Sequence, residues 1–338
     1  MKVLGKGSNP LDLLDTTKND SLKYSVGPLL YMPALRTDIA DKIISFRIYK
    51  PLSVAICLED TIKDSMVNRA EKNLVIQIGK LSEMVGQRAD ITDLPLIFIR
   101  VRNPGQIKRI ADMLGDSSLL ICGFILSKID DAVFETYLPV IKEINKGIRK
   151  FYFMPIIENH SIISPVSRYE KLQNLYDLME EVHPYILNVR VGGNDFSSCF
   201  ALVNSVEQTV YDLMPVAGIL SDISTIFSRK YIVSAPVWNY FDNGKDDRWK
   251  TGLVREMNID KSAGFIGKTV IHPSQIPVVI ENMKVMKDDY NDAVNLLNSI
   301  DSSIQVIKGG ADNRMVEHKV HKRWAEKTVH LASVYGIR

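Results

Sequence analysis

The sequence lacks the features that mark membrane-spanning, secreted and thiolate-metal proteins. No stretch approaches the roughly 18 uninterrupted apolar residues of a membrane span, and residues 1–14, MKVLGKGSNPLDLL, have no apolar signal core. The three cysteines, Cys57, Cys122 and Cys199, show no CxxC spacing. This pattern favours free thiols, two of them inside apolar runs, over a redox pair or a metal site. We therefore expect a cytoplasmic protein with no membrane partner.

An excess of charge of one sign is also lacking. The 42 Lys and Arg residues nearly balance the 40 Asp and Glu residues, which leaves a formal net charge of +2. This balance argues against a nucleic-acid partner, which would call for a basic surface. An anionic small molecule, by contrast, needs only a few cations placed together in one pocket.

What the sequence does contain is a repeated alternation of apolar runs with longer amphipathic segments. The runs are continuous, as in strands buried on both faces of a parallel sheet, and the segments between them show helical spacing. Eight such units in about 250 of the 338 residues predict a (β/α)8 barrel. A doubly wound open sheet is the alternative, but no run leads into a GxGxxG turn. The runs are GPLLYMPA, LSVAICLED, LPLIFIRVRN, LLICGFILSK, FYFMPIIE, ILNVRVGGND, YIVSAPVW and AGFIGKTVIHP.

The chain divides into two parts after the last apolar run. Residues 1–276 are predicted to form the TIM barrel, with about the first 25 residues as an N-terminal extension. Residues 277–338 are predicted to be helical and to serve as a lid or an oligomerisation segment. The basic stretch at 313–336 within this part is typical of a solvated helix face.

Charged and polar residues gather at the ends of the eight runs. In a barrel of this class the active site is formed where the strands end, so these residues are the candidates for chemistry. Two arginines two positions apart on one strand should point to the same side, and a barrel interior holds guanidinium groups only opposite anions. The strand-end residues are Glu59, Asp60, Arg100, Arg102, Lys128, Glu158, Asn194, Asp195 and His272.

Two of these acids, Glu158 and Asp195, follow neighbouring runs, and neither has a His or Cys partner at metal-binding spacing. Two carboxylates with open positions suit a hard divalent cation, Mg²⁺ first and Mn²⁺ as the alternative. Paired acids also occur in glycosidases, but the nearby arginines favour an anionic, oxygen-rich substrate. His272 precedes a proline at the end of the last run, where a structural role is at least as well supported as catalysis.

Eight pieces of the chain, in order, resemble the HpcH/HpaI aldolase and citrate lyase beta-subunit family. The most specific is GFIGKTVIHPSQIPVVIENM, and others are VAICLEDTIKDSMVNRA, IFIRVRN, MPIIENHSII and VRVGGNDFSSCFAL. The likeness runs from about Pro28 to Tyr335, and the branch is similar to lyase-like proteins encoded near tellurite-resistance genes. It implies a Mg²⁺-dependent carbon–carbon bond lyase or aldolase, acting on acyl-CoA thioesters in many members and assembled as a homotrimer or hexamer.

The strand-end residues and the resemblance together suggest a mechanism with roles for individual residues. Glu158 and Asp195 would bind the metal, and Glu317 on the C-terminal lid would donate or accept a proton across a subunit interface. Arg100, or Arg102 if the register is shifted, would stabilise the enolate that cleavage leaves. The substrate and the metal ligands would be positioned by Arg36, Glu59, Asp60 and Lys128 and by the flexible backbone of Gly192, Gly193 and Asn194.

The substrate stays open at this point. Residues 19–28, NDSLKYSVGP, carry Lys23 as their only cation where CoA-using members have arginines. Free 2-oxo or hydroxy acids and CoA thioesters therefore both stay candidate substrates. The same site would also suit thioester hydrolysis or aldol cleavage of a phosphorylated substrate. A non-catalytic barrel in a stress-response assembly is the remaining alternative, which is disfavoured because a buried pair of acids is costly without an ion.

Overall fold

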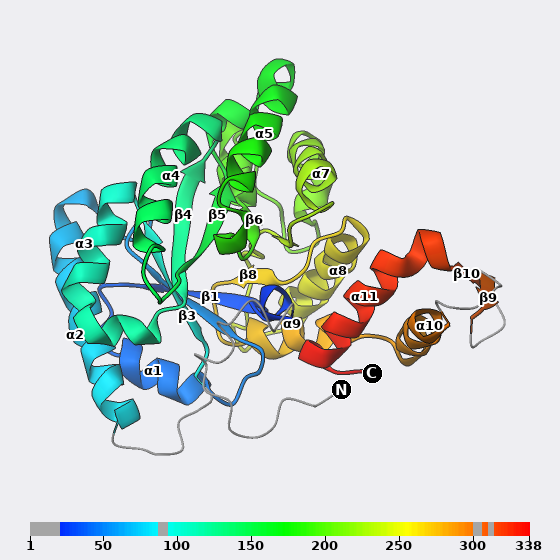
Figure 1. Cartoon of the computed structure of the whole chain (residues 1–338), viewed down its shortest axis with the longest axis horizontal. Helices are drawn as coiled ribbons and strands as arrows, with labels where there is room; N and C mark the ends of the chain where they lie inside the picture. Colours follow the sequence, from blue (N-terminus) through cyan, green and yellow to red (C-terminus); the bar gives the residue numbers. More distant parts are fainter. Residues whose placement is uncertain (1–20, 87–93, 300–305, 310–313) are drawn as a thin grey trace.

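The computed structural model describes residues 21–86, 94–299, 306–309 and 314–338, so most of the expected N-terminal extension lies outside the described part. At its centre eight parallel strands form one sheet, in the hydrogen-bonded order β7-β6-β5-β4-β3-β2-β1-β8 (Figure 1). Each strand overlaps the apolar run that predicts it. The strands are β1 (Pro28–Pro33), β2 (Ser53–Cys57), β3 (Leu96–Val101), β4 (Gly123–Ile129), β5 (Tyr152–Ile157), β6 (Val189–Val191), β7 (Val233–Ser234) and β8 (Lys268–Val270).

The sheet closes into a barrel between β7 and β8. A parallel bridge pairs Ala235 with Lys268, and the amide of Ile266 donates to the carbonyl of Val233 at 2.8 Å. On its other side, β8 pairs in parallel with β1. The predicted (β/α)8 barrel is therefore confirmed, and the alternative of an open sheet is wrong.

Helices surround the barrel (Figure 1), and two of them begin at a residue whose side chain caps the first turn. The side chain of Asn103 accepts from the amide of Gln106 at 3.1 Å, and Asp130 accepts from the amide of Val133 at 2.8 Å. Among the described helices, none is long and apolar enough to cross a membrane. The helices that accompany the barrel are α1 (Ile39–Phe46), α2 (Val67–Gly86), α3 (Pro104–Leu114), α4 (Asp131–Ile144), α5 (Pro165–Glu180), α6 (Gly193–Cys199), α7 (Met214–Phe227), α8 (Arg248–Ser262) and α9 (Gln275–Met283).

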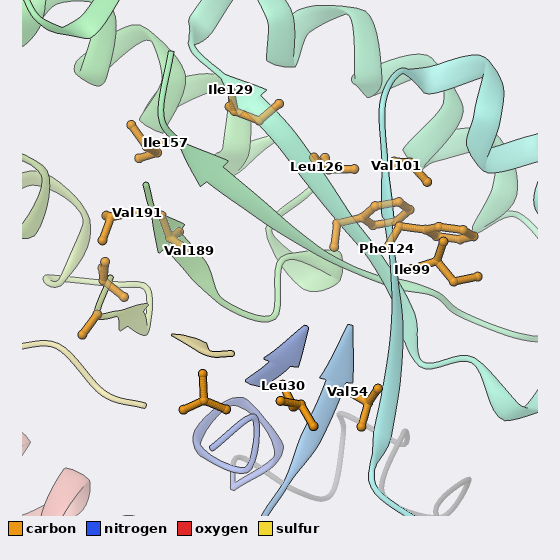
Figure 2. Packing of buried hydrophobic residues seen from close by; sticks show 14 of the residues in the cluster. Leu30, Val54, Ile99, Val101, Phe124, Leu126, Ile129, Ile157, Val189 and Val191 are labelled. Carbon is orange, nitrogen blue, oxygen red and sulfur yellow. The ribbon is translucent and has the colours of Figure 1, made fainter. Parts of the chain in front are cut away.

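Two apolar cores hold the barrel together, one on each face of the sheet. The larger core lies between the sheet and the helices, and Figure 2 shows Ile99 and Phe124 among its strand residues. The smaller core fills the barrel interior and takes their neighbours on the same strands, Phe98 and Ile125. The apolar runs are continuous because both faces of each strand are buried in this way.

The C-terminal segment leaves the barrel after α9 and contains α10 (Lys287–Asn298), the antiparallel strands β9 (Val306–Lys308) and β10 (Met315–Glu317), and α11 (His318–Tyr335). Figure 1 shows β9 and β10 at its outer end, away from the barrel strands. The predicted boundary at 276 falls inside α9, which packs on β1 and α8 and so belongs with the barrel. The segment is predicted to be helical throughout, and β9 and β10 depart from that prediction.

The cysteines are free thiols, as predicted from their spacing. Cys57 on β2 and Cys122 before β4 are buried, whereas Cys199 on α6 is exposed. Burial raises the pKa of the Cys122 thiol to about 11, because the thiolate would be cut off from water.

Candidate active site

Three carboxylates meet at the C-terminal ends of the barrel strands. Asp60 follows β2, Glu158 follows β5, and Asp195 lies in the first turn of α6. One oxygen of each lies within 4.8 Å of the oxygens of the other two. The structure thus brings together the two predicted metal ligands, and Asp60, predicted to position the substrate, joins them as a third ligand candidate.

Arg100 near the end of β3 is the cation of this cluster. Its Nη2 lies 2.8 Å from Oε2 of Glu59, 3.0 Å from Oδ2 of Asp60 and 2.9 Å from Oε1 of Glu158. Its Nε donates to Oγ of Ser127 at 2.9 Å. Burial works to lower the pKa of Arg100, but the facing acids, Glu158 first, raise it well above its usual value. Within the described chain Nη1 has no hydrogen-bond partner, so it remains for a substrate oxygen.

Lys128 connects the three carboxylates from the end of β4. Its Nζ bonds Asp195 and lies 3.3 Å from Oδ2 of Asp60, and its backbone amide donates to Oε1 of Glu158 at 3.0 Å. The register of β4 against β5 is irregular here, and Lys128 adopts a left-handed φ of 55°. Backbone strain of this kind in a residue other than glycine concentrates at functional sites. The strained conformation turns both the amide and the ammonium of Lys128 toward the acids.

Glu158 is the most deeply placed of the three acids, with 3% of its surface exposed. Burial raises its pKa to about 7, while Arg100 opposes this shift and Asp195 reinforces it. The acid that ends an apolar run is therefore held by a guanidinium and an amide, because an unpartnered carboxylate would be too costly at this depth.

The glycines before Asp195 are required by close packing. Gly192 and Gly193 line the same cavity as the acids, and a Cβ on Gly193 would lie 2.8 Å from Cβ of Pro236. Neither glycine has a positive φ, so the flexibility expected of them is not what the structure uses. Asn194 also lines the cavity.

A cavity of about 280 Å³ opens beside the carboxylates, and several of its lining residues are absent from the predicted set, among them the polar residues Tyr31, Thr61, Arg190 and Thr269. Arg190 lies on β6 with 1% of its surface exposed, and its Nη2 donates to Oγ1 of Thr269 at 2.6 Å. Arg190 is a charged residue inside an apolar run, and this was the signal in the sequence that could have identified it.

Arg102 does not share the cavity with Arg100. β3 ends at Val101, so the strand alternation does not extend to Arg102, and its side chain turns to the loop after β2. There Nε donates to the carbonyl of Leu58 at 2.7 Å, and Nη1 lies 2.5 Å from Oδ1 of Asp64. The prediction that both arginines point to the same side is therefore wrong.

Two other predicted residues lie away from the cavity of this chain. Arg36 is at the surface, where its Nη2 pairs with Oδ2 of Asp38 at 2.6 Å. The prediction that Arg36 positions the substrate in this site is therefore not met within the chain. Glu317 ends β10 on the C-terminal segment, and its amide lies 2.9 Å from Nδ1 of His321. Within a single chain, neither side chain is among those that line the cavity.

His272 serves the turn after β8, in line with the structural alternative. Its Nδ1 lies 2.9 Å from Oγ of Ser274, and its ring stacks on Phe241 with centroids 4.7 Å apart. The neighbouring Gln275 accepts from the His272 amide at 3.2 Å and donates to the carbonyl of Trp238 at 2.9 Å. These contacts attach α9 to the loop after β7.

The buried lysine of the Gly-Lys motif is structural as well. Lys268 points outward from β8, fully buried, and its Nζ lies 2.8 Å from Oε1 of Glu256 and 2.7 Å from Oδ2 of Asp260. Both acids lie on α8. Two carboxylates around one ammonium attach this helix to the strand that closes the barrel.

The acidic cluster fits a hard divalent cation. The atoms of Asp60, Glu158 and Asp195 that could bind a metal are all carboxylate oxygens, and the cluster includes no His or Cys within the described residues. Oxygen donors of this kind select Mg²⁺ or Mn²⁺ over softer metals, and three acids leave coordination positions for water and substrate. The residues present therefore fit the Mg²⁺ that the sequence resemblance implies.

The fold and the site together define an enzyme of the TIM-barrel class, with an acidic centre and a facing arginine at the strand ends. The family model for carbon–carbon bond lyases of the TIM-barrel fold matches residues 20–337. The chain belongs to this family, which confirms the predicted class of carbon–carbon lyase. No curated protein sequence matches the chain.

Solved citrate lyase structures share the fold. A citrate lyase from Burkholderia xenovorans LB400 is 12% identical with a TM-score of 0.67, over 92% of this chain and 93% of that one. The protein CitE from Mycobacterium tuberculosis, in complex with magnesium, acetoacetate and coenzyme A, is 17% identical with a TM-score of 0.57, over 90% and 97%. The citrate lyase beta subunit of the same organism, complexed with oxaloacetate and magnesium, is 17% identical with a TM-score of 0.51, over 78% and 98%. The predicted resemblance to citrate lyase beta subunits is therefore confirmed at the level of family and fold.

Proposed function

We propose that the chain cleaves a carbon–carbon bond of a small 2-oxo or hydroxy acid and depends on Mg²⁺, or Mn²⁺, held by Asp60, Glu158 and Asp195. The observation that carries this proposal is the meeting of these acids within 4.8 Å of one another, directly beside Arg100. When bound, the metal would supply Lewis-acid polarisation of a substrate oxygen. The metal-containing structures of CitE and of the citrate lyase beta subunit support this assignment.

Arg100 is the group assigned to the developing negative charge of the reaction. Cleavage leaves an enolate on one fragment, and Nη1 of Arg100 is the nitrogen available to donate to its oxygen. Glu59 and Glu158 fix the same guanidinium through Nη2, so they act as positioning residues for Arg100. A donor held in advance in this way stabilises the transition state without reorganising, to an extent of about 3 kcal/mol in comparable sites.

The enolate carbon also needs a proton donor, and Glu317 is assigned to this role in the site of a neighbouring copy. In its own chain Glu317 lies on β10 outside the cavity. The proposal therefore requires an oligomer, for which the resemblance to the family suggests a homotrimer or hexamer. Mixed oligomers of Glu317→Gln and Asp195→Asn chains test it, because activity should return on mixing two inactive variants and would stay absent if Glu317 acted within one chain.

The substrate form is tested by product analysis. Free 2-oxo and hydroxy acids, their CoA thioesters and phosphorylated analogues are incubated with the protein and Mg²⁺ or EDTA, and the products are identified by mass spectrometry. We expect cleavage into two carbon fragments that EDTA abolishes. Release of CoA without carbon–carbon cleavage would indicate a thioester hydrolase, and cleavage confined to phosphorylated compounds would indicate a phospho-substrate aldolase.

A further inference from the structure

Arg190 is a buried cation whose guanidinium is largely unsatisfied. It projects from β6 into the barrel, lines the cavity beside the acids and has 1% of its surface exposed. Its Nη2 donates to Oγ1 of Thr269 at 2.6 Å, but neither Nε nor Nη1 has a hydrogen-bond partner within the described chain. A buried polar group without a partner is rare in native proteins, so these two nitrogens call for a ligand.

The contrast with the other buried cations sharpens this point. Arg100 contacts three carboxylates, Lys268 contacts two, and Arg168 lies 2.7 Å from Oδ2 of Asp222. For Arg190, no ion pair with an Asp or Glu occurs in the part of the chain that the structure describes. Its polar neighbours include the hydroxyl of Thr269, which accepts from Nη2, and the hydroxyl of Tyr31, which interacts with the guanidinium electrostatically and through a side-chain hydrogen bond. Neither hydroxyl neutralises a buried guanidinium, so the missing partner is an anion.

The register of the strands places this cation relative to the metal-type acids. Arg190 pairs with Ile156 of β5, two residues before Glu158, and Thr269 pairs with Leu29 of β1, two residues before Tyr31. Ile156 and Glu158 both line the cavity, and Leu29 and Tyr31 are two apart on β1, so Arg190 and Thr269 lie one layer deeper in the barrel than Glu158 and Tyr31. The same cavity is lined by both layers.

We propose that Arg190 and Thr269, with Tyr31 beside them, bind a second carboxylate of the substrate while its 2-oxo or hydroxy acid end lies at the metal carboxylates above. The substrate class is then a small dicarboxylic acid, and this inference rests on the proposed lyase function for the position of the first carboxylate. Nη1 shares the end edge of the guanidinium with Nη2 and can donate a charge-assisted hydrogen bond to a carboxylate oxygen there, and Nε offers a further free N–H on another edge. The cavity of about 280 Å³ lies below the roughly 300–1,000 Å³ of pockets for drug-sized ligands, which suits a small acid.

Matched pairs of acids test the proposal. Lactate and malate differ by one carboxylate, and so do 2-oxobutyrate and 2-oxoglutarate, so the binding of each is measured by calorimetry with Mg²⁺-loaded protein. We expect the dicarboxylate of at least one pair to bind about 10- to 100-fold more tightly than its monocarboxylate match, as for a charge-assisted hydrogen bond. Equal affinity within both pairs for the wild type would overturn the proposal.

Variants then locate the effect. Arg190→Gln should bring the affinities of the two members of the pair to within about twofold of each other, and Arg190→Lys should keep part of the preference because it keeps the charge. Arg47→Gln, at an exposed arginine of α1's C-terminal end, is the matched control and should keep the full preference. Mn²⁺ binding measured by electron paramagnetic resonance shows that each variant is folded at the site. A preference that survives in Arg190→Gln with its metal bound would contradict the assignment.

The same measurements separate this inference from the proposed function. If acids bind equally with and without Mg²⁺ but the preference still depends on Arg190, the anion subsite stands and the metal assignment fails. If binding depends on Mg²⁺ but no preference appears, the metal assignment stands and the subsite fails. Tighter binding of glycerol 3-phosphate than of either dicarboxylate would overturn the carboxylate assignment in favour of a phosphate ester.

Discussion

Gly192 and Glu158 lie so close together that a Cβ on Gly192 would stand 2.3 Å from Cβ of Glu158 and 2.6 Å from its Oε2. The same Cβ would lie 3.3 Å from Oδ2 of Asp195. The two acids therefore reach one another only because the residue between them has no side chain. Position 192 needs a glycine because the acidic cluster leaves no room for a side chain, and not because the backbone there adopts a left-handed conformation.

The first prediction concerns this contact. Gly192→Ala should lower Mn²⁺ affinity by about 10- to 100-fold, because a methyl group would displace the carboxylate of Glu158 from its neighbours. Gly218→Ala is the matched control: Gly218 lies exposed in α7 with open space around it, so the change should leave metal affinity unaltered and stabilise the fold by about 0.5–1 kcal/mol. Unchanged metal affinity in Gly192→Ala would mean that Glu158 is not a ligand.

The second prediction concerns the left-handed backbone of Lys128. A glycine adopts a φ of 55° without the clash that a Cβ causes, so Lys128→Gly should be more stable than Lys128→Ala by about 1–2 kcal/mol in urea unfolding. Both variants lose the ammonium equally, so the difference between them isolates the backbone. The reverse order of stability would show that Lys128 is not held in this conformation.

The third prediction separates the arginine of the site from an arginine of the surface. Arg100→Lys should lower kcat by about 100-fold or more, because an ammonium cannot serve Glu158, Ser127 and a substrate oxygen together. Arg36→Lys should leave kcat and KM within about twofold, since Arg36 contacts Asp38 at the surface. A similar loss of kcat in the two variants would show that Arg36 belongs to the active site.

The fourth prediction concerns the ion cluster behind β8. Lys268→Met leaves Glu256 and Asp260 buried without their cation and should destabilise the fold by about 3–5 kcal/mol. Lys284→Met removes a surface pair with Glu281 and should cost less than about 1 kcal/mol. Chemical denaturation compares the two variants, and a small loss for Lys268→Met would argue that the cluster does not hold α8 to the barrel.

The sequence predicts the barrel well because the pattern has one physical cause. Strands buried on both faces read as continuous apolar runs, and this holds even for β7, which has two residues within the run YIVSAPVW. The ends of those runs identified Glu158 and Asp195 for the same reason, because a charge that follows a buried strand has to lie in the site or at the surface.

The predictions for single residues failed where they depended on distances that a pattern does not contain. Arg102 was assigned by alternation, but the strand ends one residue earlier. Arg36 was expected to position the substrate from the first loop, but its side chain pairs with Asp38 at the surface. Glu317, expected to act in the site of a neighbouring subunit, stays a prediction, since it lies outside the cavity of its own chain. Arg190 lies inside the run ILNVRVGGND and not at its end, so the rule that strand ends carry the site does not identify it, although a charge inside a buried strand must also find a partner.

The measurement that tests the central claim most directly is a calorimetric titration of Mg²⁺ and Mn²⁺ into the wild type, Glu158→Gln and Asp195→Asn. The account predicts one metal per chain in the wild type and a loss of about tenfold or more in affinity in each variant, because each removes a charged oxygen ligand. Titration with 2-oxoglutarate present should show binding of the acid only when the metal is bound. Absence of metal binding in the wild type, or a metal affinity in either variant equal to that of the wild type, would contradict the account.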